Sequence, residues 1–144
     1  MTRAAAAVLA VLALAGCGAA GLRGGGDPVA TDARNALAAM AAEYQGGQTE
    51  DFFGRFDHRD FPNYEAFREK TNDFLLRNRQ LTVDIIVDSV VQEDGKMAVQ
   101  AHWNRSFVDE QGARKLEEGR CEFVLRRRAS GGLALLSIHG DSPF

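Results

Sequence analysis

The chain has 144 residues, with 17 Lys and Arg against 20 Asp and Glu and a formal net charge of −3. This length gives room for one domain and excludes a two-domain enzyme. A slightly acidic chain without a dominant basic face is not typical of nucleic-acid-binding proteins, so we expect no nucleic-acid partner. The two Cys and three His show no recognisable metal-ligand spacing, and we expect neither a metal nor a cofactor.

Residues 1–16 have the pattern of a secretory signal peptide. Arg3 gives a positive start, and residues 4–15 are apolar or small and carry no charge. Such a stretch forms roughly 18 Å of helix, well short of the ~30 Å hydrocarbon core of a bilayer. We therefore expect this segment to be removed as a signal peptide and not to remain as a transmembrane helix.

The segment ends in Leu14-Ala15-Gly16-Cys17, which resembles the lipobox of bacterial lipoproteins. The resemblance implies that Cys17 becomes the first mature residue, with lipid on its sulfur and its amino group. Two acyl chains give stable anchoring, so the partner of this end would be a membrane. The expected location is the cell envelope, facing the periplasm or the exterior. The alternative is an ordinary secretory signal with a coincidental Cys.

The segment after Cys17 is rich in glycine and predicts a flexible tether over residues 17–30. Residues 31–144 form the predicted domain. Cys121 is the only other cysteine, so if Cys17 is acylated it is the only free thiol and no intramolecular disulfide can form.

Three amphipathic helices are predicted at the start of the domain. Residues 32–44 repeat apolar side chains every three or four positions, with Thr31 placed to cap the start. A shorter helix begins at Thr49, and a third follows Asn63 as its cap. The apolar positions are Ala33, Leu37, Met40, Ala41 and Tyr44 in the first, Phe52, Phe53 and Phe56 in the second, and Tyr64, Phe67, Thr71, Phe74 and Leu75 in the third.

After Arg79 the apolar period changes from helical to alternating, which predicts four strands over residues 81–92, 97–107, 115–126 and 133–138. The inner rows are Leu81, Val83, Ile85, Val87 and Val91, then Met97, Val99, Ala101, Trp103 and Phe107, then Cys121, Phe123 and Leu125. The fourth strand lacks polar alternates, so we expect both its faces to be covered.

The turns fix the expected register. A two-residue Asp94-Gly95 turn would put the first two apolar rows on opposite faces, because a slip of one residue reverses every side chain. A three-residue loop over residues 93–95 instead pairs Val91 with Met97 and keeps both rows on one core. The next hairpin then places Gly119 opposite Trp103, leaving space beneath the indole.

The order of elements, the Glu50-Asp51-Phe52-Phe53 helix and the final residues 135–144 resemble the NTF2-like (SnoaL-like, ketosteroid-isomerase-like) cone fold. This resemblance implies an α+β domain, with three N-terminal helices packed on a curved four-stranded antiparallel sheet around an inner cavity. It also implies that enzymes of this type would hold an acid/base pair, commonly Asp with Tyr or His with Asp, inside the cone. No such pair can be matched here, and the catalytic residues are unknown.

The candidate ligand-binding residues are Arg105, Glu117, Trp103, Tyr44 and Tyr64. Arg105 interrupts an apolar row, and cross-strand pairing puts Glu117 beside it. This pair either binds a polar group at the mouth of the cavity or is a structural pair at the end of the sheet. The two tyrosines either point into the cavity or pack in the core with partnered hydroxyls. His139 and Asp141 share a face, but two ligands are too few for a metal site.

The leading interpretation is a lipid-anchored binding or scaffold module of the cell envelope, without catalysis and with a small apolar ligand in the cone. The alternative is a small acid/base enzyme, an isomerase, dehydratase or hydrolase, acting on an apolar molecule in the same cavity. The outer sheet face is polar, and resemblance to the cone fold implies a homodimer through it. Cys121 is expected to be a buried structural thiol.

Overall fold

The computed structural model describes residues 26–144, which form three helices followed by four strands. The elements are α1 (Pro28–Gln45), α2 (Thr49–Gly54), α3 (Tyr64–Arg77), β1 (Arg79–Glu93), β2 (Lys96–Val108), β3 (Arg114–Arg127) and β4 (Leu133–Gly140). The predicted signal peptide, Cys17 and the tether up to residue 25 lie outside the described residues. This order confirms the predicted succession of helices and strands.

Helix α1 begins earlier than the apolar pattern predicted. Pro28 occupies the first turn, and the side chain of Asp27 accepts a hydrogen bond from the backbone N–H of Val29 at 3.0 Å. Asp27, and not Thr31, is therefore the N-cap, because a carboxylate there satisfies a free N–H of the first turn. Residues 28–30, expected in the tether, are helical.

The other two helices differ from expectation only at their ends. Helix α2 ends at Gly54, so Phe56 lies beyond it, although its ring is buried as predicted. Asn63 precedes α3 in the left-handed conformation, with φ of 51°, and its side chain makes no capping hydrogen bond. Asn63 thus turns the chain into α3 without capping it, which fits the tolerance of Asn for this backbone region.

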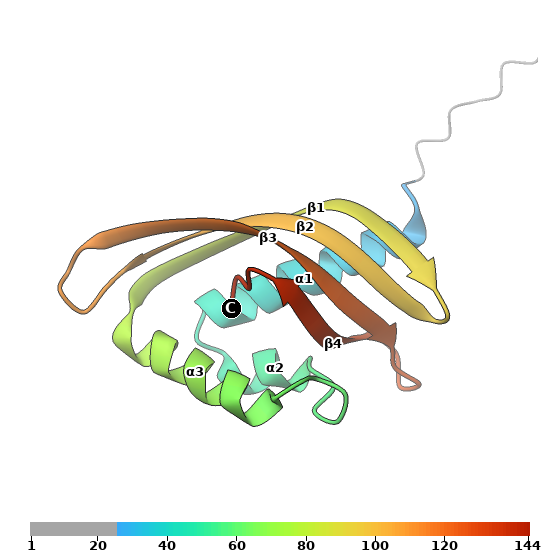
Figure 1. The fold of residues 1–144 in the computed structure, drawn as a ribbon, viewed down its shortest axis with the longest axis horizontal. Coiled ribbons are helices and arrows are strands. Elements are labelled where there is room, and N and C mark those ends of the chain that lie inside the picture. The colour runs from blue at the N-terminus through green and yellow to red at the C-terminus, as the bar shows by residue number, and fades with distance from the viewer. Residues whose placement is uncertain (1–25) are drawn as a thin grey trace, which may run out of the picture.

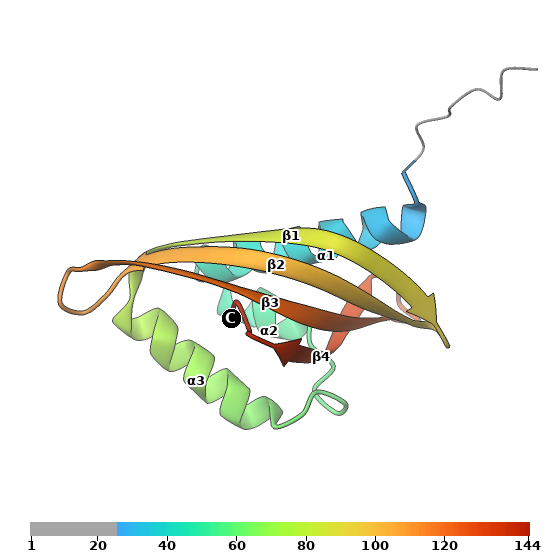
Figure 2. The ribbon, with the colours of Figure 1, turned by 45° about the horizontal axis from the view of Figure 1, so that its top comes forward.

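The sheet is antiparallel, with strand order β1-β2-β3-β4. Its strands arch over the helices, and α3 lies across the open side of the arch (Figure 1). Turned by 45°, the molecule shows β1, β2 and β3 side by side above α3, with β4 following β3 (Figure 2). The predicted α+β architecture, with helices packed on a curved four-stranded sheet, is confirmed.

The first hairpin corrects the predicted register. Its turn is the two-residue Asp94-Gly95 turn, with φ of 50° and 74°, and Val91 pairs with Ala98 instead of Met97. The pairing shifts between Val87 and Ser89, so one residue, Asp88, is extra on β1. This β-bulge returns the inner rows to one face beyond it. Val91, expected inside, is consequently 58 % exposed.

The remaining registers agree with expectation. Ile85 pairs with Trp103, and Trp103 pairs with Gly119 on β3. A Cβ on Gly119 would lie 2.6 Å from the Cζ2 atom of the indole, so only glycine leaves room for the ring. Arg105 pairs with Glu117, as predicted.

Strand β4 is covered on both faces, as its sequence predicted. Ala134, Leu135 and Leu136 are all buried. The loop after α2 pairs with β4 at a single parallel bridge between Phe56 and Leu135, where each backbone hydrogen bond measures 2.9 Å. This bridge joins the helical layer to the far edge of the sheet.

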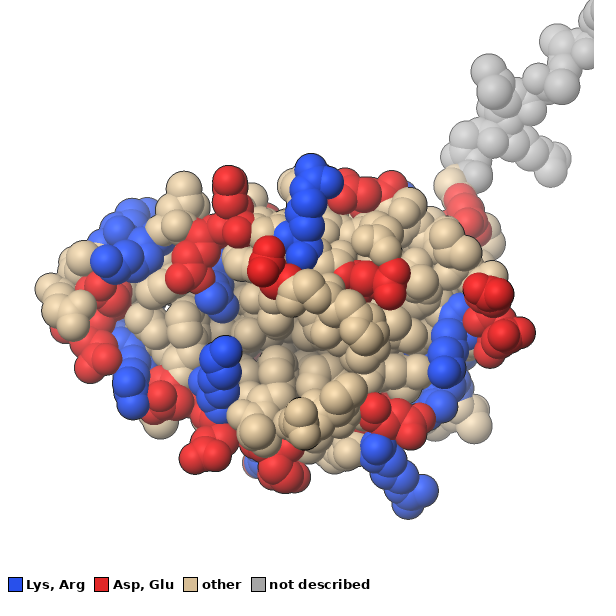
Figure 3. All heavy atoms as spheres, in the orientation of Figure 1, with Lys and Arg blue, Asp and Glu red and all other residues tan. Residues whose placement is uncertain are grey.

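The surface carries both signs of charge. Lys and Arg side chains stand beside Asp and Glu around the rim of the face shown in Figure 3, and the middle of that face is uncharged. Among residues 26–144, no helix has the length and hydropathy needed to cross a membrane.

Candidate functional site

The interior of the cone is lined by aromatic rings. Tyr44 of α1 lies 5.2 Å from Phe52 and 5.2 Å from Phe144, measured between ring centroids. The ring of Phe144 also lies 5.0 Å from that of Phe52 and 6.2 Å from that of Phe123 on β3. We call Tyr44, Phe52, Phe74, Phe123 and Phe144 the mouth cluster. Its members come from α1, α2, α3, β3 and the segment after β4, so every layer of the fold contributes.

A charged residue closes this cluster on the sheet side. The guanidinium carbon of Arg105 lies 4.5 Å from the ring centroid of Phe74, a distance that permits a cation–π interaction. Its Nε donates to Oε2 of Glu117 at 2.8 Å, and its Nη2 forms a short ion pair with the same oxygen. The Arg105 side chain is only 13 % exposed, whereas that of Glu117 is 43 % exposed. The predicted pair is therefore present, with the cation inside and the carboxylate at the rim.

Tyr44 is buried beside this cation. Its hydroxyl oxygen has no hydrogen-bond partner among the described residues. Burial raises the pKa of Tyr44 to about 12, and the nearby positive charge of Arg105 opposes this increase only in part. A buried hydroxyl that lacks a well-formed hydrogen bond costs free energy, and Arg105 lies close enough to act on this one.

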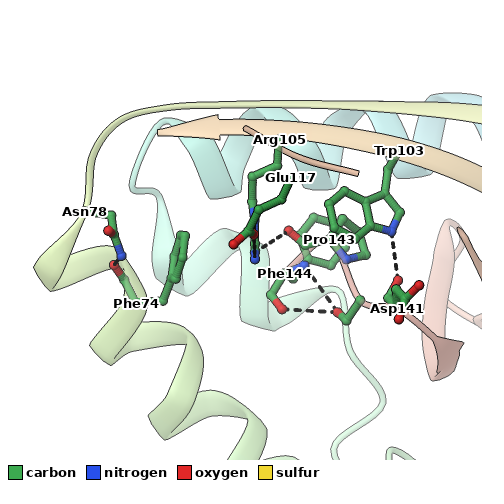
Figure 4. Close-up of polar contacts among 9 residues, drawn as sticks. Phe74, Asn78, Trp103, Arg105, Glu117, Asp141, Pro143 and Phe144 are labelled. Atoms are coloured by element: carbon green, nitrogen blue, oxygen red, sulfur yellow. Dashed lines mark hydrogen bonds and ion pairs between the residues drawn. The ribbon is translucent and has the colours of Figure 1, made fainter. Parts of the chain in front are cut away.

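The segment Asp141–Phe144, which we call the strap, crosses the mouth of the cone. Nε1 of Trp103 donates to the backbone carbonyl of Asp141 at 2.8 Å, and Nη1 of Arg105 donates to that of Pro143 at 3.0 Å. Pro143 is fully buried. Figure 4 shows Trp103 and Arg105 reaching from β2 to these two carbonyls, with Phe74 on the other side of Arg105. Arg105 is thus held by the strap as well as by Glu117.

The strap has an internal fold of its own. The backbone N–H of Phe144 donates to Oγ of Ser142 at 3.2 Å, and the Ser142 hydroxyl donates to the Phe144 carbonyl at 3.1 Å. Gly140, where β4 ends, has φ of 95°, and a Cβ there would lie 2.8 Å from the carbonyl oxygen of Arg120. Only glycine fits this bend, which turns the chain from the sheet edge into the cone.

Tyr64 lies in a different cluster from the other four predicted ligand-binding residues. Its ring stacks on His58 at 4.2 Å and lies 6.2 Å from Phe56 and 6.4 Å from Phe61. The α3 cluster, as we name it, consists of Phe53, Phe56, Phe61, Tyr64 and Phe67. Its aromatic contacts place Tyr64 among core rings, although its hydroxyl also has no partner among the described residues. Arg105, Glu117, Trp103 and Tyr44 come together, and Tyr64 does not join them.

Two hollows border the strap. One, of about 380 Å³, is lined by Trp103, Gly119 and Asp141 together with His102, Glu118 and Arg120. The other, of about 310 Å³, has an apolar lining that includes Phe61, Phe67 and Ile138, and it also touches Ser142. Consecutive residues of the strap therefore form part of the wall of both hollows.

The remaining candidates serve other contacts. Cys121 is buried, and desolvation together with the nearby Asp141 raises the pKa of its thiol to about 12, so it is a poor nucleophile. His139 contacts Oγ of Ser137 at 3.0 Å. No cluster of three or more metal-ligating side chains occurs within residues 26–144.

Sequence reasoning did not find the strap. Asp141, Pro143 and Phe144 follow the last periodic residue, and neither helical nor strand periodicity applies to them. The signal that could have found them is local: Gly140 followed by Ser142-Pro143 indicates a change of chain direction, and an aromatic residue after such a turn needs a buried site.

No family profile and no curated protein sequence matches this chain. Its fold, however, matches many solved structures. An NTF2-like superfamily protein from Salmonella enterica is similar with a TM-score of 0.65 and 10 % identity, over 81 % of this chain and 92 % of that one. A ketosteroid isomerase-like protein from Erwinia carotovora has a TM-score of 0.63 and 14 % identity, over 82 % and 99 %.

A third similar structure, ActVI-ORFA from Streptomyces coelicolor, has a TM-score of 0.61 and 17 % identity, over 80 % of this chain and 97 % of that one. Identities this low concern the fold and not the chemistry, because one fold supports many functions. Helices packed on an open four-stranded antiparallel sheet, together with these neighbours, establish that the chain adopts the NTF2-like fold.

Proposed function

We propose that this protein is a lipid-anchored binding module of the cell envelope whose cone receives a small aromatic molecule bearing a negative or strongly polar group. The observation that supports the ligand site is a single one: the largely buried guanidinium of Arg105 and the hydroxyl of Tyr44 adjoin the aromatic rings of the mouth cluster. Apolar walls with a few convergent polar groups are typical of small-molecule sites.

Binding is favoured over acid/base catalysis by the ionisation of these groups. General acid/base catalysis is most efficient when the pKa lies near the working pH. The pKa of Tyr44 is raised to about 12, and the guanidinium of Arg105, a group with N–H donors only, is paired with Glu117. Both groups are therefore suited to hold a ligand by donated hydrogen bonds, and neither is suited to move a proton near neutral pH.

The ligand site is tested by titrating the protein with phenylacetate while following the fluorescence of Trp103, the only tryptophan. We expect saturable binding that weakens about tenfold in Arg105→Gln, because the charge-assisted hydrogen bond is lost. Benzylamine, which has a similar ring and the opposite charge, is the control ligand. Equal responses to the two compounds would contradict an anion-accepting site.

The anchor is proposed from Leu14-Ala15-Gly16-Cys17 alone. Expression of the full chain in a bacterial host should place the protein in the detergent-soluble membrane fraction, with the mass of acyl chains on Cys17. Cys17→Ser is the matched variant and should lose both properties. A wild-type protein that is released without detergent and has an unmodified Cys17 would refute the anchor.

The outer sheet face is the surface proposed for a second copy. Ile86, Val91 and Leu116 point outward and are 48 %, 58 % and 76 % exposed. Burial of such residues in a dimer would remove apolar surface from water. Light scattering after size-exclusion chromatography should give a dimer for the wild type and a monomer for Ile86→Asp. A wild-type monomer at high concentration would exclude this interface.

A further inference from the structure

We propose that the strap, Asp141–Phe144, is a built-in occupant of the cone that an external ligand must displace. This inference rests on the proposed ligand site and adds its regulation. Phe144 fills the space between Tyr44, Phe52 and Phe123, which is the space that the ring of a ligand would take. The closed state is therefore the state that the structure shows.

The polar contacts of the strap support the same inference. Trp103 and Arg105 donate to the carbonyl oxygens of Asp141 and Pro143, so the strap uses two of the donors that face the mouth of the cone. It does not reach the third polar group, because the Tyr44 hydroxyl stays without a partner although the Phe144 ring lies against the Tyr44 ring. A ligand that offers an acceptor to this hydroxyl gains a contact that the strap lacks.

The attachment of the strap allows it to leave as a unit. Gly140 supplies the bend at its start, and the two hydrogen bonds between Ser142 and Phe144 lie within the strap itself. The hollow of about 380 Å³ lies against Asp141, and that of about 310 Å³ lies against Ser142. Outward movement of the strap would open the interior toward both hollows.

The energetic consequence is a lower apparent affinity. When only a fraction of molecules is open, the apparent Kd equals the intrinsic Kd divided by that fraction. Loss of the Phe144 ring should raise the open fraction, and the ligand should bind more tightly to the variant than to the wild type.

The test compares the full-length wild type, Phe144→Ala and the control variant Leu76→Ala, whose side chain is 85 % exposed on α3. Two probes are titrated, phenylacetate and the peptide acetyl-Gly-Asp-Ser-Pro-Phe-amide, which copies residues 140–144. We expect both to bind Phe144→Ala about tenfold more tightly than the wild type or Leu76→Ala. Iodide quenching of Trp103 should also increase in Phe144→Ala, and the peptide should reverse this increase.

The outcomes separate the two proposals. Equal affinity of phenylacetate for wild type and Phe144→Ala would overturn the gate and leave the ligand site standing. Tighter binding of the peptide to Phe144→Ala, with no binding of phenylacetate to either protein, would support the gate and refute the proposed ligand. Unchanged iodide quenching in Phe144→Ala would also overturn the gate.

A second variant protects the test from a folding defect. Ser142→Ala removes the hydrogen bonds within the strap and leaves every ring of the mouth cluster in place. We expect a smaller change in quenching and affinity, in the same direction as in Phe144→Ala. Circular dichroism establishes that each variant is folded, and a folded Ser142→Ala identical to the wild type in both readouts counts against the strap as a gate.

Discussion

The α3 cluster and the mouth cluster lie beneath the same sheet, yet they differ in what completes them. In the α3 cluster, aromatic rings pack on one another, and segments around α2 and α3 supply all of them. In the mouth cluster, rings from distant segments pack together, the ring of Phe74 lies against the cation of Arg105, and the last ring arrives on the strap. Packing by rings alone needs only shape, whereas a buried charge also needs partners for its N–H groups. The mouth cluster therefore depends on a short segment, and the α3 cluster does not.

The largest expected effect comes from the residue that joins the two clusters. Phe52 is fully buried and contacts Phe53 and Phe56 as well as Tyr44 and Phe144. Phe52→Ala should lower the free energy of unfolding by about 3–5 kcal/mol, because both clusters lose a shared neighbour. Urea unfolding followed by circular dichroism measures this loss. A cost below that of an ordinary surface substitution such as Leu76→Ala would show that the clusters are not coupled through Phe52.

The next effect isolates the charge of the mouth cluster. Arg105→Met keeps an apolar stem against Phe74 but removes the donors to Glu117 and to the Pro143 carbonyl. We expect a loss of about 2 kcal/mol, since Glu117 can turn to water while the buried carbonyl cannot. Increased iodide quenching of Trp103 should accompany it. A variant as stable as the wild type would mean that apolar packing alone holds the mouth closed.

The close approach of β3 to the indole gives a third test. A Cβ at Gly119 would lie 2.6 Å from Trp103 and 2.8 Å from the Cβ of Asp141, so Gly119→Ala presses on the sheet side of the strap. We expect a destabilisation of about 1–3 kcal/mol with altered Trp103 fluorescence. Gly54→Ala is the matched control, because nothing lies within 4 Å of a Cβ there. Equal behaviour of the two variants would show that the indole adjusts freely.

The smallest effect concerns the unpartnered hydroxyl of the mouth cluster. The pKa of Tyr44 is about 12 in the folded protein against 10.0 for the free side chain. The folded protein holds the Tyr44 proton to a higher pH than the unfolded chain does. The stability that this difference contributes is therefore complete below pH 10 and is lost as the pH rises toward 12. At neutral pH, Tyr44→Phe should be at least as stable as the wild type and up to about 1 kcal/mol more stable, because it removes a buried unsatisfied group.

The same variant should lose less stability than the wild type above pH 10. Thermal unfolding from pH 8 to pH 11 measures the difference, and the thiol of Cys121 affects both proteins alike. Parallel stability curves for the two proteins would show that the hydroxyl ionises as freely in the folded state as in water.

The parts of the fold and site that could be predicted from the sequence are those in which apolar residues repeat with helical or strand spacing. Alternating side chains placed Trp103 over Gly119 and Arg105 beside Glu117, and the structure has both pairs. The alternation of apolar residues alone could not locate the extra residue Asp88. Both a bulge within the strand and a longer turn bring the two apolar rows back to one face, so the same pattern fits either. Helical spacing put Tyr44 and Tyr64 on core faces but did not say which end of the cone each ring reaches.

The strap was beyond such reasoning for a different reason. Its position depends on a bend at Gly140 and on two donors, Trp103 and Arg105, each 38 residues along the chain from the residue to which it donates. Local pattern records which residues are apolar, but not which distant group will donate a hydrogen bond to a given backbone carbonyl. The site was therefore predicted on its sheet side and missed on the side that closes it.

The bulge at Asp88 has a consequence for how the molecule tolerates changes of length. Beyond this residue, the hairpin from Ser89 to Lys96 continues the sheet with regular pairing, and its side chains again alternate between the inner and outer faces. Adding or removing matched pairs of residues at the tip should therefore leave the interior untouched, because Val87 before the bulge and Val90 after it both stay on the core side of the sheet. The tip is therefore a site at which a peptide can be grafted with equal numbers of residues added to β1 and β2, while the bulge at Asp88 is kept.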